Sequence, residues 1–140
     1  MVLFGRSDRE TFDENLSYLK KVEYKTGTAR GEGECRIYTM LEDKVKKEYI
    51  NFFRMPDDLS VVMYPYTKDE FLRGLREFQI GRWKREYFRK RVLDGWYWDL
   101  CFYYSNDLPA AHFHGSNAMP ENYRAFEAFM KAGEEKQEVK

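Results

Sequence analysis

Alternation of apolar and polar side chains is the clearest pattern along the chain, and it is strongest over residues 96–104, "WYWDLCFYY". Trp98, Leu100 and Phe102 fall on one side of an extended chain, and polar or small residues fall between them. Residues 110–115 continue the same period after a short polar turn. We therefore expect these two segments to pair antiparallel as a β-hairpin.

Shorter runs of the same kind predict further strands in the first half of the chain. These runs are residues 16–27, 35–41, 44–53 and 60–66. The glycine-rich stretch between the first two is typical of a flexible connection or hairpin loop. In the last run, Pro65 marks either an edge strand or the end of the strand, because proline cannot donate to a sheet.

Two other segments have apolar residues at helical spacing. Residues 67–81 begin with a capping box, in which Thr67 is followed three positions later by Glu70, and Gly81 suits the end of this helix. A second helix is predicted from Pro120, which is favoured at a first helical position, to Gly133.

The order of strands, helix, strands and helix predicts an α+β fold. We expect an antiparallel sheet with two or three helices, in which a C-terminal β-hairpin is followed by an amphipathic helix. Residues 1–133 are expected to form a single domain and residues 134–140 a polar tail, while residues 82–95 are expected to be partly helical. The residues expected to share one core are Trp98, Leu100, Phe102, Phe113, Phe126 and Phe129.

The overall composition limits the classes of function. The 140 residues include 24 basic and 24 acidic side chains, so the net charge gives no general attraction to nucleic acid or membranes. No apolar run is long enough for a signal peptide or a membrane span. The two cysteines form no CxxC pair, which is typical of a reduced cytoplasmic protein, although a single disulfide stays open as an alternative.

The two histidines raise the question of a metal site. His112 and His114 share one side of the second hairpin strand, and two histidines at this spacing can reach one metal ion. A site needs three or four ligands, and the others would have to come from Asp99 on the neighbouring strand, from Cys35 or Cys101, or from other carboxylates. We favour an outer sheet face that carries two solvated imidazoles, and we expect no metal and no cofactor.

Catalytic chemistry has little support in the sequence. No P-loop, GxGxxG, GxSxG, HExxH or CxxC motif occurs. Cys101 faces the same side of the hairpin as His112 and His114, so a nucleophilic cysteine with a histidine base is conceivable. A small residue within a sheet is the favoured interpretation of Cys101. We therefore expect no catalytic residues, and a protein that is not an enzyme.

The charge distribution indicates one candidate binding segment. Residues 68–92 contain nine lysines and arginines against four acids, whereas residues 93–120 contain three acids and no basic residue. Arginine, tryptophan and tyrosine are common at the centres of protein interfaces, and the same mixture can hold phosphates and stack bases. A solvated helix face is the third interpretation. The candidate partner-binding residues are Arg82, Trp83, Lys84, Arg85, Tyr87, Arg89, Lys90 and Arg91.

The second half of the chain resembles a known group of domains. From residue 93 it reads "LDGWYWDLCFYYSNDLPAAHFHGSNAMPENYRAFEAFM", and "FQIGRW" precedes it. This pattern, written DG-x-x-W-x-L … GSNAxPxNY, is similar to the C-terminal signature of small uncharacterised bacterial domains that are commonest in Firmicutes. The resemblance covers residues 78–130. It implies a hairpin followed by a C-terminal helix, and it brings no activity.

These observations favour a non-catalytic protein-binding module. It would be a small regulator or inhibitor of a bacterial or mobile-element system, and it would contact its protein partner through the basic aromatic segment. The alternative is a nucleic-acid-binding protein that uses the basic aromatic patch at residues 82–91. No membrane association is expected for either.

Overall fold

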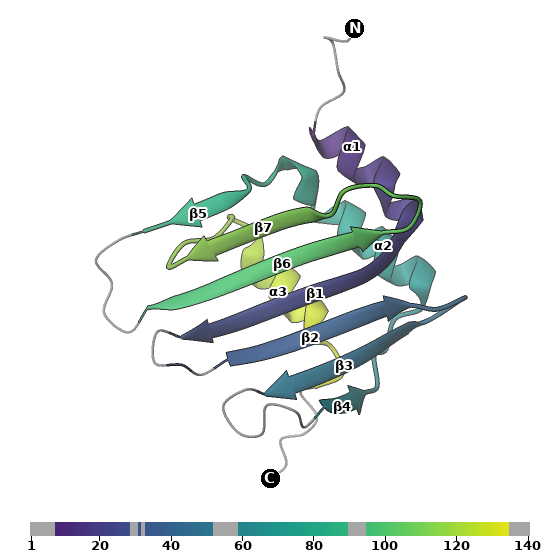
Figure 1. Ribbon diagram of the computed structural model, residues 1–140, viewed down its shortest axis with the longest axis horizontal. Coiled ribbons are helices and arrows are strands. Elements are labelled where there is room, and N and C mark those ends of the chain that lie inside the picture. The colour runs from purple at the N-terminus through teal and green to yellow at the C-terminus, as the bar shows by residue number, and fades with distance from the viewer. Residues whose placement is uncertain (1–7, 29–30, 32, 52–58, 90–94, 135–140) are drawn as a thin grey trace, which may run out of the picture.

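Seven strands and three α-helices make up the described part of this computed structural model (Figure 1). The structure describes residues 8–28, 31, 33–51, 59–89 and 95–134. The strands are β1 (Leu19–Thr28), β2 (Gly33–Met40), β3 (Val45–Asn51), β4 (Leu59–Val62), β5 (Glu86–Phe88), β6 (Trp96–Tyr104) and β7 (Ala111–Ser116). The helices are α1 (Asp8–Asn15), α2 (Lys68–Glu77) and α3 (Tyr123–Met130), with 3₁₀ turns at Leu16–Tyr18 and Ile80–Arg82.

The strands form one sheet in the order β4-β3-β2-β1-β6-β7-β5 (Figure 1). Neighbouring strands run antiparallel, with the exception of β5, which pairs parallel to β7. The α+β class is therefore confirmed, but the sheet is mixed and not antiparallel throughout. Within it, β6 and β7 pair antiparallel, with Leu100 opposite Phe113 and Cys101 opposite His112.

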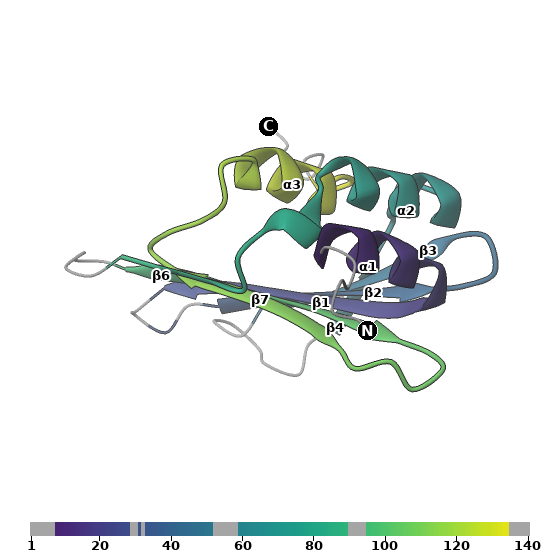
Figure 2. The ribbon, with the colours of Figure 1, turned by 90° about the horizontal axis from the view of Figure 1, so that it is seen from above.

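All three helices lie on the same face of the sheet (Figure 2). The core is formed between this face and the helices, and Trp98, Leu100, Phe102, Phe113 and Phe126 are buried there, as expected. Phe129 is only partly buried at the margin of this core.

Several local signals predict the elements correctly, and others misplace their ends. The Thr67–Glu70 capping box is present, and β4 is an edge strand that ends before Pro65. The helix predicted to end at Gly81 ends at Glu77 and is followed by the 3₁₀ turn. The helix predicted to begin at Pro120 begins at Tyr123.

Within the range 82–95, for which partial helix was predicted, the described residues 83–89 are not helical. The 3₁₀ turn ends at Arg82, and Glu86–Phe88 then forms the short strand β5 beside β7. Tyr87 is half-buried and packs against the core, whereas Glu86 and Phe88 are exposed. The alternation of inward and outward side chains over Glu86–Phe88 is too short to indicate a strand from the sequence alone. It becomes evident in the structure, where β5 pairs with β7. Residues 90–94 lie outside the described part of the chain.

A buried lysine fixes the C-terminal end of α3 against the sheet. Lys47 of β3 is fully buried, and its Nζ donates hydrogen bonds to the carbonyl oxygens of Met130 (2.7 Å) and Ala132 (3.2 Å). Its Nζ also lies 2.6 Å from a carboxylate oxygen of Glu134. The two carboxylate oxygens of Glu134 each accept one hydrogen bond from the guanidinium of Arg36. Glu134, the first residue of the expected polar tail, thus joins two buried cations to the end of the chain's last helix.

Two remaining expectations concern the thiols and the membrane. Cys35 and Cys101 are both free, the first buried and the second half-buried. The longest α-helix of the described residues has ten residues, and none of the described helices is long and apolar enough to cross a bilayer.

Replacing Phe126 by alanine should reduce the free energy of unfolding by about 3–5 kcal/mol, because the cavity left in a close-packed core cannot collapse fully. Phe126 is fully buried, and its ring lies 5.3 Å from the ring of Trp83 and 5.6 Å from that of Tyr24. Phe88→Ala is the matched control, since Phe88 is 63% exposed. Urea denaturation of both variants measures the effect, and equal stabilities would contradict the proposed core.

Glu134→Gln should cost about 3 kcal/mol at neutral pH, because it removes the negative charge that lies 2.6 Å from the buried Nζ of Lys47 and accepts two hydrogen bonds from the buried Arg36. Burial by itself would raise the pKa of Glu134, but hydrogen bonds from Arg36 and Lys47 outweigh burial and lower this pKa below its ordinary value of 4.5. The carboxylate therefore stabilises the fold above pH 4.5, and this contribution is lost as the pH falls through the lowered pKa.

Denaturation of wild type and variant between pH 3 and 7 should show a smaller pH dependence in Glu134→Gln. Glu127→Gln is the control, because Glu127 pairs with the more exposed cations Arg124 and Lys131, and pairs of this kind contribute at most about 1 kcal/mol. A parallel pH dependence in wild type and Glu134→Gln would contradict the assigned role of Glu134.

Candidate functional site

The basic segment forms one edge of the sheet. The amide of His114 donates to the carbonyl of Arg85 (3.0 Å), and the amide of Arg89 donates to the carbonyl of Ser116 (3.0 Å). Because backbone groups alternate in direction along a strand, those of Glu86 and Phe88 point away from β7. In the described part of the chain, β5 has no neighbour on that outer side. This edge therefore presents backbone donors and acceptors to another strand.

The structure describes four of the six candidate cations. Arg82, Lys84, Arg85 and Arg89 are exposed, and none has an ion-pair partner among the described residues. The guanidinium carbon of Arg85 lies over the ring of Phe113 at 4.6 Å from the centroid, so the charged group contacts a core ring while the residue as a whole stays exposed. Lys90 and Arg91 lie outside the described residues.

The rings of the basic segment differ in their exposure. Trp83 is only 8% exposed, and its Nε1–H donates to Oδ1 of Asn122 (3.0 Å), so it anchors the segment in the core. Tyr87 is half-buried, and its hydroxyl accepts a hydrogen bond from the amide of Lys84 (2.9 Å). Phe88, which was absent from the predicted site, is the exposed ring of β5.

Two asparagines position the segment from the connection between β7 and α3. Asn122 binds Trp83 and donates to the carbonyl of Phe78 (2.8 Å). Asn117 accepts from the amide of Trp96 (2.9 Å) and donates to the carbonyl of Arg89 (3.2 Å). The quoted motif GSNAxPxNY contains both asparagines, but the sequence alone indicated no such role for them. The left-handed backbone at Asn117 (φ 59°) explains its place in "GSNA".

None of the described helices lies over the opposite face of the sheet (Figure 2). The strand alternation places polar and charged side chains there, and some pair along their own strand, such as Lys21 with Glu23 (3.3 Å) and Lys46 with Glu48 (3.5 Å). We call this surface the open face. Its residues on β6 and β7 are Tyr97, Asp99, Cys101, Tyr103, His112, His114 and Ser116.

The open face brings together the four residues considered as metal ligands or catalytic groups on the hairpin. His112 Nε2 lies 3.0 Å from each carboxylate oxygen of Asp99. One ligand atom from each of Asp99, Cys101 and His112 falls within 4.8 Å of the other two. The ring of His114 stacks on that of His112 with a centroid distance of 5.1 Å. Cys35 lies on β2, two strands from β6, and is not part of this cluster.

Burial raises the pKa of the Cys101 thiol, against the opposing effect of a hydrogen bond from Tyr103. A thiol acts as a nucleophile only as the thiolate, which requires a lowered pKa. The surroundings of Cys101 therefore keep the thiol protonated at neutral pH. His112 Nε2 is also directed at Asp99, so it is not aligned as a base for this thiol.

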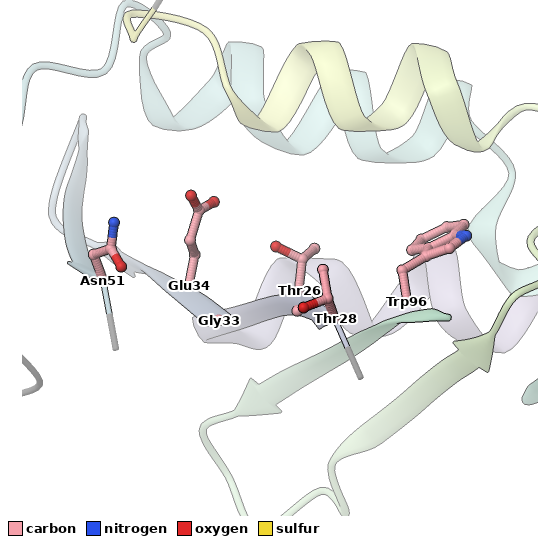
Figure 3. Close-up of a pocket in the computed structure, with 7 residues that line it drawn as sticks. Thr26, Thr28, Gly33, Glu34, Asn51 and Trp96 are labelled. Carbon is pink, nitrogen blue, oxygen red and sulfur yellow. The ribbon is translucent and has the colours of Figure 1, made fainter. Parts of the chain in front are cut away.

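A cavity of about 410 Å³ opens on the helix-covered face, at the ends of β1 and β3. Figure 3 shows Thr26, Glu34, Asn51 and Trp96 pointing from the sheet toward the helices above it. One indole ring with a few hydroxyl, amide and carboxylate groups suits a small polar molecule. Asn117 connects the wall of this cavity to the basic segment, because its side chain accepts a hydrogen bond from the amide of Trp96 and donates one to the carbonyl of Arg89.

Comparison of the chain with protein-family models, curated proteins and solved structures finds no match. The resemblance of residues 78–130 to Firmicutes domains therefore stays a prediction. Function has to be inferred from the geometry of the basic edge and of the open face.

Proposed function

We propose that the chain is a non-catalytic protein-binding module, a small regulator or inhibitor that captures an extended acidic segment of its partner along the outer edge of β5. Three features of one sheet edge carry this proposal. The backbone groups of Glu86 and Phe88 point outward, and the ring of Phe88 is exposed. The described cations beside them are exposed and have no acidic partner among the described residues.

The edge geometry supports strand addition. An extended peptide can pair with the outward N–H and C=O groups of Glu86 and Phe88, and such main-chain bonds supply affinity without requiring a particular sequence. Phe88 then offers an apolar contact on one side of the added strand. Side chains of the added strand would alternate between the open face and the helix-covered face, which gives the interaction its selectivity.

The charges identify the chemistry of the partner. Arg82, Lys84, Arg85 and Arg89 would repel a second copy of the same edge, so they oppose self-association through β5. The same charges attract an acidic segment and accelerate its encounter. These side chains are exposed and lack ion pairs within the described residues, so apart from the contact of Arg85 with the ring of Phe113 the fold gains little from them.

The alternative of nucleic-acid binding has less geometric support. The cations suit phosphates, but stacking of bases requires exposed ring faces. Burial of Trp83 and partial burial of Tyr87 leave Phe88 as the accessible ring of the described segment. A protein segment uses the backbone edge as well as the charges, so the geometry favours protein over nucleic acid.

Replacing Arg85, Arg89 and Arg91 together by serine should leave the melting temperature nearly unchanged and abolish partner binding, because the charges contribute to recognition more than to folding. Partners are captured from extracts of the native host with and without nuclease, and they are identified by mass spectrometry. The matched control replaces Lys20, Arg73 and Arg76 by serine, which removes the same charge at exposed positions away from β5.

Unfolding of the triple variant would mean that the arginines are structural and would contradict the proposal. So would a partner that binds the triple variant with wild-type affinity. Loss of the partner after nuclease treatment, together with a steep decrease of affinity with added salt, would favour the nucleic-acid alternative.

Phe88→Pro should weaken partner binding more than Phe88→Ala does, because proline also removes the outward N–H that an added strand would use. Its N–H does not face β7, so the melting temperature should fall little. Tyr87→Pro is the control that removes an inward N–H and should destabilise the pairing of β5 with β7. Equal partner affinities of Phe88→Pro and Phe88→Ala would exclude strand addition at β5.

A further inference from the structure

The cluster on the open face contains three different kinds of metal ligand. Asp99 offers a carboxylate oxygen, Cys101 a sulfur and His112 an imidazole nitrogen, and these atoms lie within 4.8 Å of one another. We infer that Asp99, Cys101 and His112 form a binding site for Zn²⁺. This inference is independent of the proposed role of β5.

The spacing of the donor atoms suits a small ion after a modest contraction. Zinc bonds nitrogen and oxygen at about 2.0–2.2 Å and sulfur at about 2.3 Å, so tetrahedral ligand atoms lie about 3.5 Å apart. The nitrogen of His112 is already 3.0 Å from both oxygens of Asp99. Rotation of the Cys101 and His112 side chains, which lie on one face, supplies the remaining adjustment.

The backbone under the cluster is rigid because its other side is the core. Cys101 and His112 are directly opposite each other on paired strands. The residues next to the ligands along the two strands, Leu100, Phe102 and Phe113, point to the opposite side of the sheet and are at most 1% exposed. Ligands on packed strands are held more precisely than ligands on loops, which lowers the entropic cost of assembling a site.

The donor set selects the class of metal. A cysteine sulfur with an imidazole favours zinc over magnesium or calcium, which prefer oxygen ligands alone, and binding of zinc releases the proton of the thiol. Glu23, which is opposite Cys101 on β1, adds negative charge, and Lys25 opposite Asp99 offsets part of it. The side chains of His112 and Asp99 are 48% and 36% exposed, so a solvent molecule can reach the fourth position.

Titration with metal tests the site directly. The full chain, purified without a histidine tag and stripped with chelator, is titrated with Zn²⁺ by calorimetry and with Co²⁺ by absorbance. We expect saturation at one equivalent and a thiolate-to-cobalt charge-transfer band. His112→Ala and Asp99→Asn should each weaken zinc binding at least about tenfold. Cys101→Ser should abolish the cobalt band, whereas the control Cys35→Ser should retain it.

Circular dichroism of each variant verifies that the sheet is intact. Absence of saturation at one equivalent in the wild type would overturn the inference, and so would a cobalt band that persists in Cys101→Ser or disappears in a folded Cys35→Ser. Where a ligand variant fails to fold, the wild-type titration and the Cys35→Ser control still support or overturn the inference.

Discussion

Coverage of the sheet by helices on one face only is the constraint on which the rest of the structure depends (Figure 2). It requires every strand to alternate, because one side must pack against helices while the other meets solvent. On β6 this alternation places Trp98, Leu100 and Phe102 in the core, and it places Asp99 and Cys101 outside. The two-residue alternation that places these three side chains in the core thus also places the cluster on the open face.

The constraint also explains how the two ends of the sheet are secured. At one end, Lys47 and Arg36 reach through the covered face to hold Glu134, which closes the helical layer over β2 and β3. At the other end, Trp83 enters the core and Asn122 fixes its indole, so the short strand β5 is held mainly by side chains outside its three residues. The proposed binding at the β5 edge would therefore require no change in the core.

Local patterns predict the parts of the fold that depend on neighbours in sequence. The alternation of β6, the capping box at Thr67 and the four cations described near β5 follow from such patterns. Helix α1, which is strongly polar, and strand β5 were not predicted, because each is stabilised by contacts with distant residues. The burial of Trp83 depends in the same way on Asn122, which is 39 residues away in the sequence. The alternation in the sequence did place Asp99 and Cys101 on the same side of the hairpin as the histidines. It could not supply the distances between their ligand atoms.

The basic edge and the open-face cluster share one property that bears on function. Neither is needed to neutralise a buried charge: the described cations that flank β5 are exposed, and the cluster lies on the solvent-facing side of the sheet. Features that contribute little to folding persist in a marginally stable domain at small energetic cost, and they can change without unfolding it. Because His114 pairs with Glu86 on one side and with Asp99 on the other, the two surfaces are contiguous across β7. A strand added to β5 would extend the same open face that carries the cluster, while the core between sheet and helices stays unaltered.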